Sequence, residues 1–340
     1  MNSLVELAGL LVVLGVGLFI IMALLSPFES LGWWAGWSKR SLDRELAGAE
    51  RELLQAGLSG RPAPAVQLSP FLGVYLVYLR GIATAEAAPS RREQGFLDAL
   101  AEYLPGSTCV ADVFPYSATN TPLTAERAFA RLYRLLSRAR ERYRNSLFSL
   151  IFIVHNLFQV GVSGDRRYGP IYNAGMAREI ARSLVRHGYT AESQGPIWVL
   201  GWSGAGQIAV GAAQYLHQLF HAQVYVVSIG GVILDEPGIA EIAHLYHLEG
   251  SRDSFPRLGD VLSPGRWPII KRSAWNRALD EGRITFVDPG PMRHTGGRDY
   301  FDHQAVLPDG KSYARRTAQV IAEIIRDEFE PHQASLTSMD

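Results

Sequence analysis

Residues 199–206, VLGWSGAG, place one serine between an apolar run and a run of small residues. The apolar run is typical of a buried strand, and the small-residue run is typical of a helix that packs closely on a sheet. A serine between such elements can project its hydroxyl only if the turn is very tight. Gly201 and Ala205, two positions before and two after Ser203, have side chains small enough for that turn. Ser203 is therefore a candidate nucleophile for attack on an acyl carbon.

The same glycines also match a loose phosphate-binding pattern, G-x-G-x-x-A, from Gly204 to Ala209. A dinucleotide site usually has an acidic residue about 20 positions further on, at the end of the next strand. Here the next apolar run, residues 224–229, leads into two glycines, and the first acid after it is Asp235. The phosphate interpretation is thus the weaker one, and no cofactor is expected. The single cysteine, Cys109, gives no support for a structural zinc site.

The segment Gly201-Trp202-Ser203-Gly204-Ala205 resembles the nucleophile elbow of the α/β-hydrolase superfamily, with Ala where the commonest form has Gly. The resemblance extends over about residues 71–329. In that superfamily the serine is followed along the chain by an acid after a later strand, and then by a histidine after the last strand. The resemblance therefore implies that the remaining catalytic residues lie C-terminal to Ser203.

That order implies Asp253 as the acid and His294 as the base. Asp253 follows the apolar run HLYHL and the residues EGSR, and His294 lies in a loop rich in Gly and Pro after the run ITFV. The alternatives are Asp235, Asp260 and Glu249 for the acid and His303 for the base.

The resemblance also implies two backbone N–H groups that bind an oxyanion. One belongs to Gly204, directly after the nucleophile. The other belongs to Ile82, because Arg80-Gly81-Ile82 follows an early apolar run and is similar to the family's His-Gly-x. Arg80 replaces the common His, which leaves the local hydrogen bonding open.

Strands and helices must alternate if these loops are to meet. Apolar runs predict strands at 74–79, 109–113, 197–200, 224–229, 244–248 and 284–287, and helical patterns fall at 91–103, 125–144, 174–186, 205–219, 274–280 and 313–329. Such alternation predicts an α/β protein with a mostly parallel sheet flanked by helices. The resemblance implies that this is the α/β-hydrolase fold, over residues 70–330.

The N-terminus carries an uncharged apolar run, residues 7–25, which is about long enough to cross a bilayer as a helix. Trp33, Trp34, Trp37 and then Lys39 follow it, as expected where a helix leaves the hydrocarbon. We therefore expect a transmembrane anchor within residues 1–30, a juxtamembrane helix and linker over 31–69, and a flexible tail over 331–340. A cleaved signal peptide and a buried core helix are the alternatives. Cations follow the run and none precedes it, which predicts a single-pass protein with its large domain in the cytoplasm.

An insertion at about residues 120–168 interrupts the alternation. Its first half is an arginine-rich amphipathic pattern that suits an anionic bilayer surface, and its second half, residues 146–162, is apolar but broken by His155 and Asn156. Three interpretations stay open: an exposed helix followed by a buried core element, a cap that rests on the bilayer and admits lipophilic substrate, or a second membrane span.

The chain has 33 basic and 33 acidic residues, so nothing in its overall charge suggests a nucleic-acid partner. The expected function is that of a membrane-anchored serine hydrolase acting on an ester, amide or thioester of a small lipophilic acyl substrate, without a metal. The alternative is a catalytically silent hydrolase-like subunit of a membrane complex.

Overall fold

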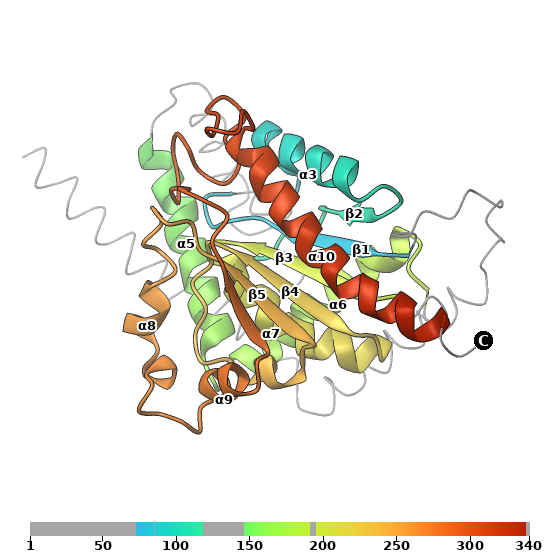
Figure 1. Ribbon diagram of the computed structural model, residues 1–340. Coiled ribbons are helices and arrows are strands. Elements are labelled where there is room, and N and C mark those ends of the chain that lie inside the picture. The colour runs from blue at the N-terminus through green and yellow to red at the C-terminus, as the bar shows by residue number, and fades with distance from the viewer. Residues whose placement is uncertain (1–72, 85, 118–145, 191–194, 338–340) are drawn as a thin grey trace, which may run out of the picture.

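The computed structural model describes residues 73–84, 86–117, 146–190 and 195–337, and the side chains of 146–152 and 330–337 are not described (Figure 1). The predicted anchor, the juxtamembrane segment and the arginine-rich helix at 125–144 lie outside these residues. Within the described ranges, no helix is both long enough and apolar enough for a bilayer span.

Six parallel strands form one sheet, in the order β2-β1-β3-β4-β5-β6. The strands are β1 (Tyr75–Leu79), β2 (Thr108–Val110), β3 (Ile197–Trp202), β4 (Val224–Ile229), β5 (His244–Leu248) and β6 (Ile284–Val287). Both faces of β1 and β4 are buried, as expected for parallel strands covered by helices on two sides. The predicted α/β architecture with a parallel sheet is confirmed.

The helices divide between the two faces of the sheet (Figure 1). α3 (Arg91–Tyr103) and α10 (Tyr313–Thr337) share one hydrophobic core with the even-numbered residues of β1. α6 (Gly169–Arg186) and α7 (Ala205–Phe220) share the other core with its odd-numbered residues. This division follows from the period of two along a strand, which sends successive side chains to opposite faces. The third long helix on the second side, α5 (Ser146–Gly164), packs against α6 and α7.

Shorter elements fill the connections on either side of β5. The 3-10 helix η2 (Pro237–Glu241) links β4 to β5. Between β5 and β6 the chain forms α8 (Leu258–Leu262), the 3-10 helix η3 (Pro264–Arg266) and α9 (Ala274–Asp280).

The chain order of the strands reverses between β1 and β3. From β1 the chain passes outward through α3 to β2, then returns to form β3 on the other side of β1. Ligands of open parallel sheets bind at the carboxyl ends of the strands beside such a switch point. The register pairs Leu79 with Gly201, so the loops after β1 and β3 leave this edge together.

Several predicted boundaries differ from those of the structure. The second strand ends at Val110 rather than Val113. Beyond its end, the carboxylate of Asp112 accepts hydrogen bonds from Ser183 and Arg186 of α6. α6 starts at Gly169, five residues earlier than predicted, with Pro170 at its first turn, where a missing N–H costs nothing. α10 continues to Thr337, into the segment predicted as the tail.

Candidate active site

Ser203 lies in a strained turn between β3 and α7. Its φ angle is +56°, a left-handed conformation that is uncommon for a residue with a side chain. Two backbone hydrogen bonds hold it there: the Ser203 N–H donates to the Ile229 carbonyl at 3.0 Å, and the Gly206 N–H donates to the Ser203 carbonyl at 3.0 Å. The turn therefore directs the hydroxyl away from the strand and the helix that it joins.

The turn is possible because β3 and α7 approach very closely. A Cβ on Gly201 would lie 2.6 Å from the carbonyl oxygen of Ala205, a backbone atom that cannot move aside. Ala205 is itself fully buried as the first residue of α7. The backbone thus leaves room for the methyl group of Ala205, two residues after Ser203, but not for any side chain at Gly201, two residues before it.

The structure brings Ser203, His294 and Asp253 into one chain of hydrogen bonds. Ser203 Oγ lies 2.9 Å from His294 Nε2, and His294 Nδ1 lies 2.9 Å from Asp253 Oδ2. The three residues follow β3, β6 and β5 and are exposed by only 6%, 8% and 6%. A serine bonded to an imidazole that is oriented by a buried carboxylate is the arrangement that activates a hydroxyl nucleophile.

Both oxygens of the Asp253 carboxylate have further donors. Oδ1 accepts from the Phe255 N–H at 2.9 Å, and Oδ2 accepts from the Tyr300 hydroxyl at 2.9 Å. The Tyr300 hydroxyl in turn accepts from the Gly250 N–H at 2.9 Å. Burial, and then the negative charge of Asp253, raise the pKa of Tyr300 far above its usual range, so this hydroxyl stays a donor.

Gly230, directly after β4, makes room for the carboxylate. Its φ is +55°, and a Cβ there would lie 2.7 Å from Asp253 Oδ2 and 2.9 Å from the Tyr300 ring. A larger residue at this position would therefore displace the acid from His294.

The imidazole of His294 lies close to two aromatic rings. The Phe255 ring stacks on it with centroids 4.1 Å apart and an interplanar angle of 11°, and the Trp202 ring lies at 6.4 Å. The loop that carries His294 is closed by a hydrogen bond from the Arg293 N–H to the Arg298 carbonyl at 2.9 Å. Packing and hydrogen bonding thus set the position of the imidazole.

The two expected oxyanion donors lie on neighbouring loops that touch. A Cβ on Gly204 would lie 2.6 Å from Ile82 Cγ2 and 2.8 Å from Val160 Cγ2, so the loop after β1 and helix α5 both contact this residue. Among the described residues, the N–H groups of Gly204 and Ile82 donate to no other group. Each of the two groups therefore still has a hydrogen to donate.

Arg80, which stands where the resemblance expects His, braces the loop after β1. Its guanidinium binds the carboxylate of Glu93 on α3 with Nη2 at 2.8 Å, and its carbonyl accepts from the Tyr116 hydroxyl at 2.7 Å. Burial alone would raise the pKa of Glu93, but the hydrogen bonds and charge of Arg80 outweigh it and lower the pKa. The ion pair is thus charged at neutral pH and fixes the start of the loop.

Asn156 holds the other end of that loop from α5. Its Nδ2 donates to the carbonyls of Ile82 and Thr84, both at 2.7 Å. Asn156 is fully buried, so these bonds are shielded from water. The second half of the predicted insertion therefore contributes to the site directly, as a helix whose polar pair faces inward.

The alternative acids are all engaged elsewhere. Asp235 binds Arg166 at 2.9 Å and accepts from the Trp275 N–H at 3.1 Å, at the start of α9. Asp260 pairs with Arg266 at 2.9 Å. The carboxylate of Glu249 lies 3.1 Å from Nε2 of the buried His247.

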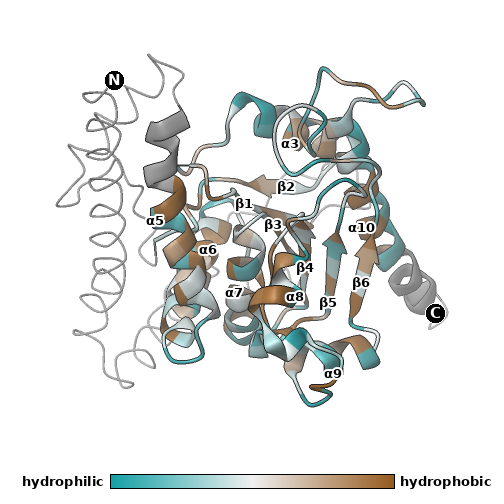
Figure 2. Cartoon of the chain, turned by 90° about the vertical axis from the view of Figure 1, so that its left-hand side faces the viewer, coloured by the Kyte–Doolittle hydropathy of each residue, from teal (hydrophilic) through white to brown (hydrophobic). Residues whose placement is uncertain are grey.

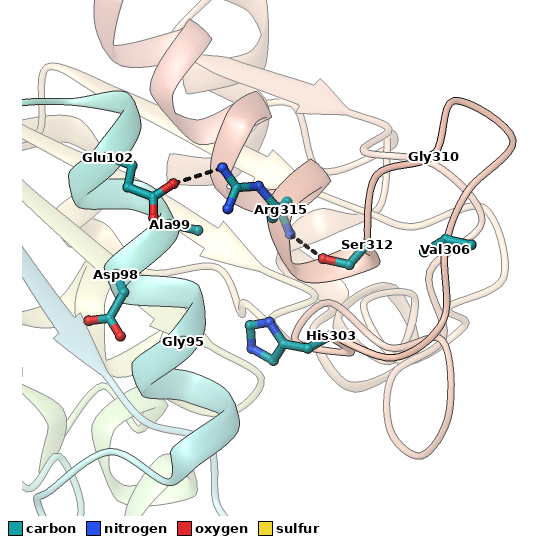
Figure 3. Close-up of a pocket in the computed structure, with 9 residues that line it drawn as sticks. All are labelled: Gly95, Asp98, Ala99, Glu102, His303, Val306, Gly310, Ser312 and Arg315. Atoms are coloured by element: carbon teal, nitrogen blue, oxygen red, sulfur yellow. Dashed lines mark hydrogen bonds and ion pairs between the residues drawn. The ribbon is translucent and has the colours of Figure 1, made fainter.

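The alternative base, His303, lies in a different place from Ser203. Its Nε2 is 2.8 Å from the Arg92 carbonyl, and its ring lies against Gly95 of α3 in the lining of a surface pocket of about 420 Å³ (Figure 3). The pocket is lined by Gly95, Asp98, Ala99, Glu102, His303, Val306, Gly310, Ser312 and Arg315. Arg315 bridges its wall by an ion pair with Glu102.

Sequence reasoning missed Tyr300, Phe255 and Asn156 as parts of the site. Tyr300 and Phe255 belong to no motif, and only the tertiary structure brings them to the triad. Asn156 left a signal, because His155 and Asn156 interrupt an otherwise apolar run. A buried polar residue in such a run needs hydrogen-bond partners, and here these are backbone carbonyls of the loop after β1.

In the described part of the chain, no group of three His, Cys, Asp or Glu residues is placed to hold a metal ion. The chain was compared with protein-family models, curated proteins and solved structures, and no match was found in any of the three.

Proposed function

We propose that the chain is a serine hydrolase of the α/β-hydrolase superfamily that cleaves an ester, amide or thioester. The observation that carries this proposal is a pair of connected hydrogen bonds, from Ser203 Oγ to His294 Nε2 and from His294 Nδ1 to Asp253 Oδ2, each 2.9 Å long. The elbow before α7 and the chain order Ser, Asp, His give it further support.

In the proposed reaction, His294 takes the proton from Ser203 as Oγ attacks the acyl carbon. Asp253 keeps the remaining proton on Nδ1 and stabilises the imidazolium. The oxyanion of the tetrahedral intermediate accepts from the N–H groups of Gly204 and Ile82, each contributing about 3 kcal/mol.

Collapse of the intermediate breaks the bond to the leaving group, which takes the proton from His294. An acyl-serine remains. Water then attacks the acyl carbon, His294 takes its proton, and the acid leaves as Ser203 regains its hydrogen.

A lipophilic acyl group is the substrate that the surroundings favour. Ile82 and Val160 contact Gly204 next to the nucleophile, and Phe255 stacks on His294 with 47% of its surface exposed. The predicted anchor at residues 7–25 is consistent with a substrate taken from a bilayer, with the hydrolase domain on the cytoplasmic side.

Labelling by a fluorophosphonate probe tests the proposal, because the probe reacts with activated serines. The full chain should become labelled, and Ser203→Ala should abolish labelling and lower hydrolysis of p-nitrophenyl butyrate by about 10⁴-fold or more. Ser254→Ala, an exposed serine beside Asp253, is the matched control and should label normally.

A full chain that resists the probe, under conditions that label a control serine hydrolase, would favour the catalytically silent subunit instead. Labelling that persists in Ser203→Ala would show that another residue is the nucleophile.

A further inference from the structure

The segment between β5 and α9 exposes large apolar side chains, unlike the rest of the described surface. Seven of the eleven exposed large hydrophobic residues of the described chain fall within residues 255–270. They are Phe255, Leu258, Val261, Leu262, Trp267, Ile269 and Ile270, and we call them the 255–270 surface. Figure 2 shows α8, which carries three of them, in brown on the side that faces the viewer. A clustered apolar patch of this kind marks an interaction site.

Two polar side chains of this region, Arg266 and Asn276, face inward. Arg266 is buried: its Nη1 donates to the Ile233 carbonyl at 2.8 Å, and its guanidinium lies 3.8 Å from the Trp275 ring centroid. Asn276 donates to the carbonyls of Trp267 and Ile270 at 2.8 and 3.0 Å. These contacts hold the backbone that carries the exposed apolar side chains in place.

The charges around the 255–270 surface are mainly positive. Arg257 within residues 255–270 and Lys271 and Arg272 directly after them are exposed, and the one exposed acid of the segment, Asp260, is paired with Arg266. The whole chain, by contrast, has equal numbers of basic and acidic residues. Aliphatic side chains bordered by cations match a bilayer with anionic headgroups.

We propose that the 255–270 surface docks on an anionic lipid bilayer and brings the entrance of the active site to it. The surface is continuous with the site, because Phe255 is both its first member and the ring stacked on His294. The role in substrate capture rests on the proposed hydrolase function, whereas the docking itself does not. The indole N–H of Trp267 already donates to the Asp260 carbonyl at 2.7 Å, so its half-exposed ring can enter an apolar medium without an unpaired donor.

Two valines provide a matched test. Val261 is 72% exposed on α8, and Val306 is 63% exposed in the pocket of Figure 3. Burial, and then the charge of Asp98, raise the pKa of Cys109 to about 11, so this thiol reacts slowly with labels at neutral pH. Cys109→Ser removes it altogether from both variants. Val261→Cys or Val306→Cys then carries an environment-sensitive fluorophore, with the full chain reconstituted in vesicles of equal parts phosphatidylcholine and phosphatidylglycerol.

Nitroxide-labelled acyl chains should quench the fluorophore at 261 at least about twofold more than the one at 306, with a blue shift only at 261. Replacing Arg257, Lys271 and Arg272 by Gln, or using pure phosphatidylcholine, should reduce that difference. Equal quenching at the two positions overturns the proposal. So does a blue shift at 261 in the vesicles without quenching by the nitroxide-labelled chains, which would show that a second copy or the chain's own N-terminal segment, and not lipid, covers the surface.

The two proposals can fail separately. Quenching at 261 without fluorophosphonate labelling would keep the docking surface and remove the hydrolase. Labelling of Ser203 without quenching at 261 would do the reverse.

Discussion

Asp253 receives three hydrogen bonds, from the Phe255 N–H, the Tyr300 hydroxyl and His294. Donors of this kind compensate a carboxylate for the loss of water on burial, and they fix the plane in which it meets the imidazole. Tyr300 is the only one of these donors that can be removed without changing the backbone or the base. It therefore offers a test of how the acid is positioned.

Tyr300→Phe should lower the kcat for p-nitrophenyl butyrate about tenfold and leave KM nearly unchanged, because it leaves the Asp253 carboxylate and the Gly250 N–H short of one partner each. The rate of fluorophosphonate labelling should fall in parallel. Tyr225→Phe is the control, since its hydroxyl donates to Gln223 at the amino end of β4. A change in KM alone would contradict a positioning role.

At this scale the sequence was informative about Ser203, Asp253 and His294, because each lies in the loop after a strand, in the chain order that the family resemblance implies. It was uninformative about Tyr300, whose distance along the chain from Asp253 says nothing about their contact. Ala205 and Arg80 departed from the family pattern, and the structure shows a packed methyl group and an ion pair with Glu93 at these positions.

At the scale of elements, helix α5 contacts the candidate site in a way that its apolar composition alone could not specify. Residues 146–164 form one helix, and Asn156 on it donates to two carbonyls of the loop after β1. Periodicity could not separate a core helix from a cap or a second span, since all three are apolar. The two hydrogen bonds link α5 to Ile82, the residue expected to donate to the oxyanion.

Asn156→Asp should lower kcat by about 10- to 100-fold, because a carboxylate in place of the amide loses two donors and faces the carbonyl oxygens of Ile82 and Thr84. Ser163→Ala is the matched control on the same helix: its hydroxyl donates to Asn173 of α6 at 2.7 Å. This control should lower Tm with little change in labelling rate. A wild-type kcat in Asn156→Asp would show that the hydrogen bonds between Asn156 and the loop after β1 do not affect catalysis.

At the scale of the whole molecule, the topology explains why residues so far apart in sequence meet. Ile82 and Ser203 follow the neighbouring strands β1 and β3, on either side of the switch point. Asp253 follows β5 and His294 follows β6, on the same side of the sheet as β3. Alternating strand and helix patterns predicted this sheet. They did not predict α8 and η3, which are too short to show a period and are held by tertiary contacts such as that of Arg266 with Ile233.

Glu236 couples the loop after β4 to α7 and makes the stability of the whole domain depend on pH. It is buried and accepts from Gln207 Nε2 at 2.9 Å, and its burial raises its pKa from 4.5 to about 7 despite the hydrogen bonds from Gly238 and Gln207, which lower it. The folded state therefore keeps a proton that the unfolded state releases. Its contribution to stability is fully present below about pH 4.5 and is lost as the pH rises to about 7.

A rise of this size corresponds to about 3 kcal/mol of unfolding free energy. Glu236→Gln, which stays neutral, should therefore be up to about 3 kcal/mol more stable than the wild type at pH 8, and the difference should shrink toward pH 4.5. Denaturant unfolding of the full chain in a mild detergent at several pH values measures it. The stability of Glu241→Gln, an exposed position at the end of the 3-10 helix that Glu236 caps, should change with pH in parallel with that of the wild type. If the stability of Glu236→Gln also changes with pH in parallel with that of the wild type, the Glu236 carboxyl is already ionised in the folded protein. Only a group that keeps its proton on folding can make the stability fall over this pH range.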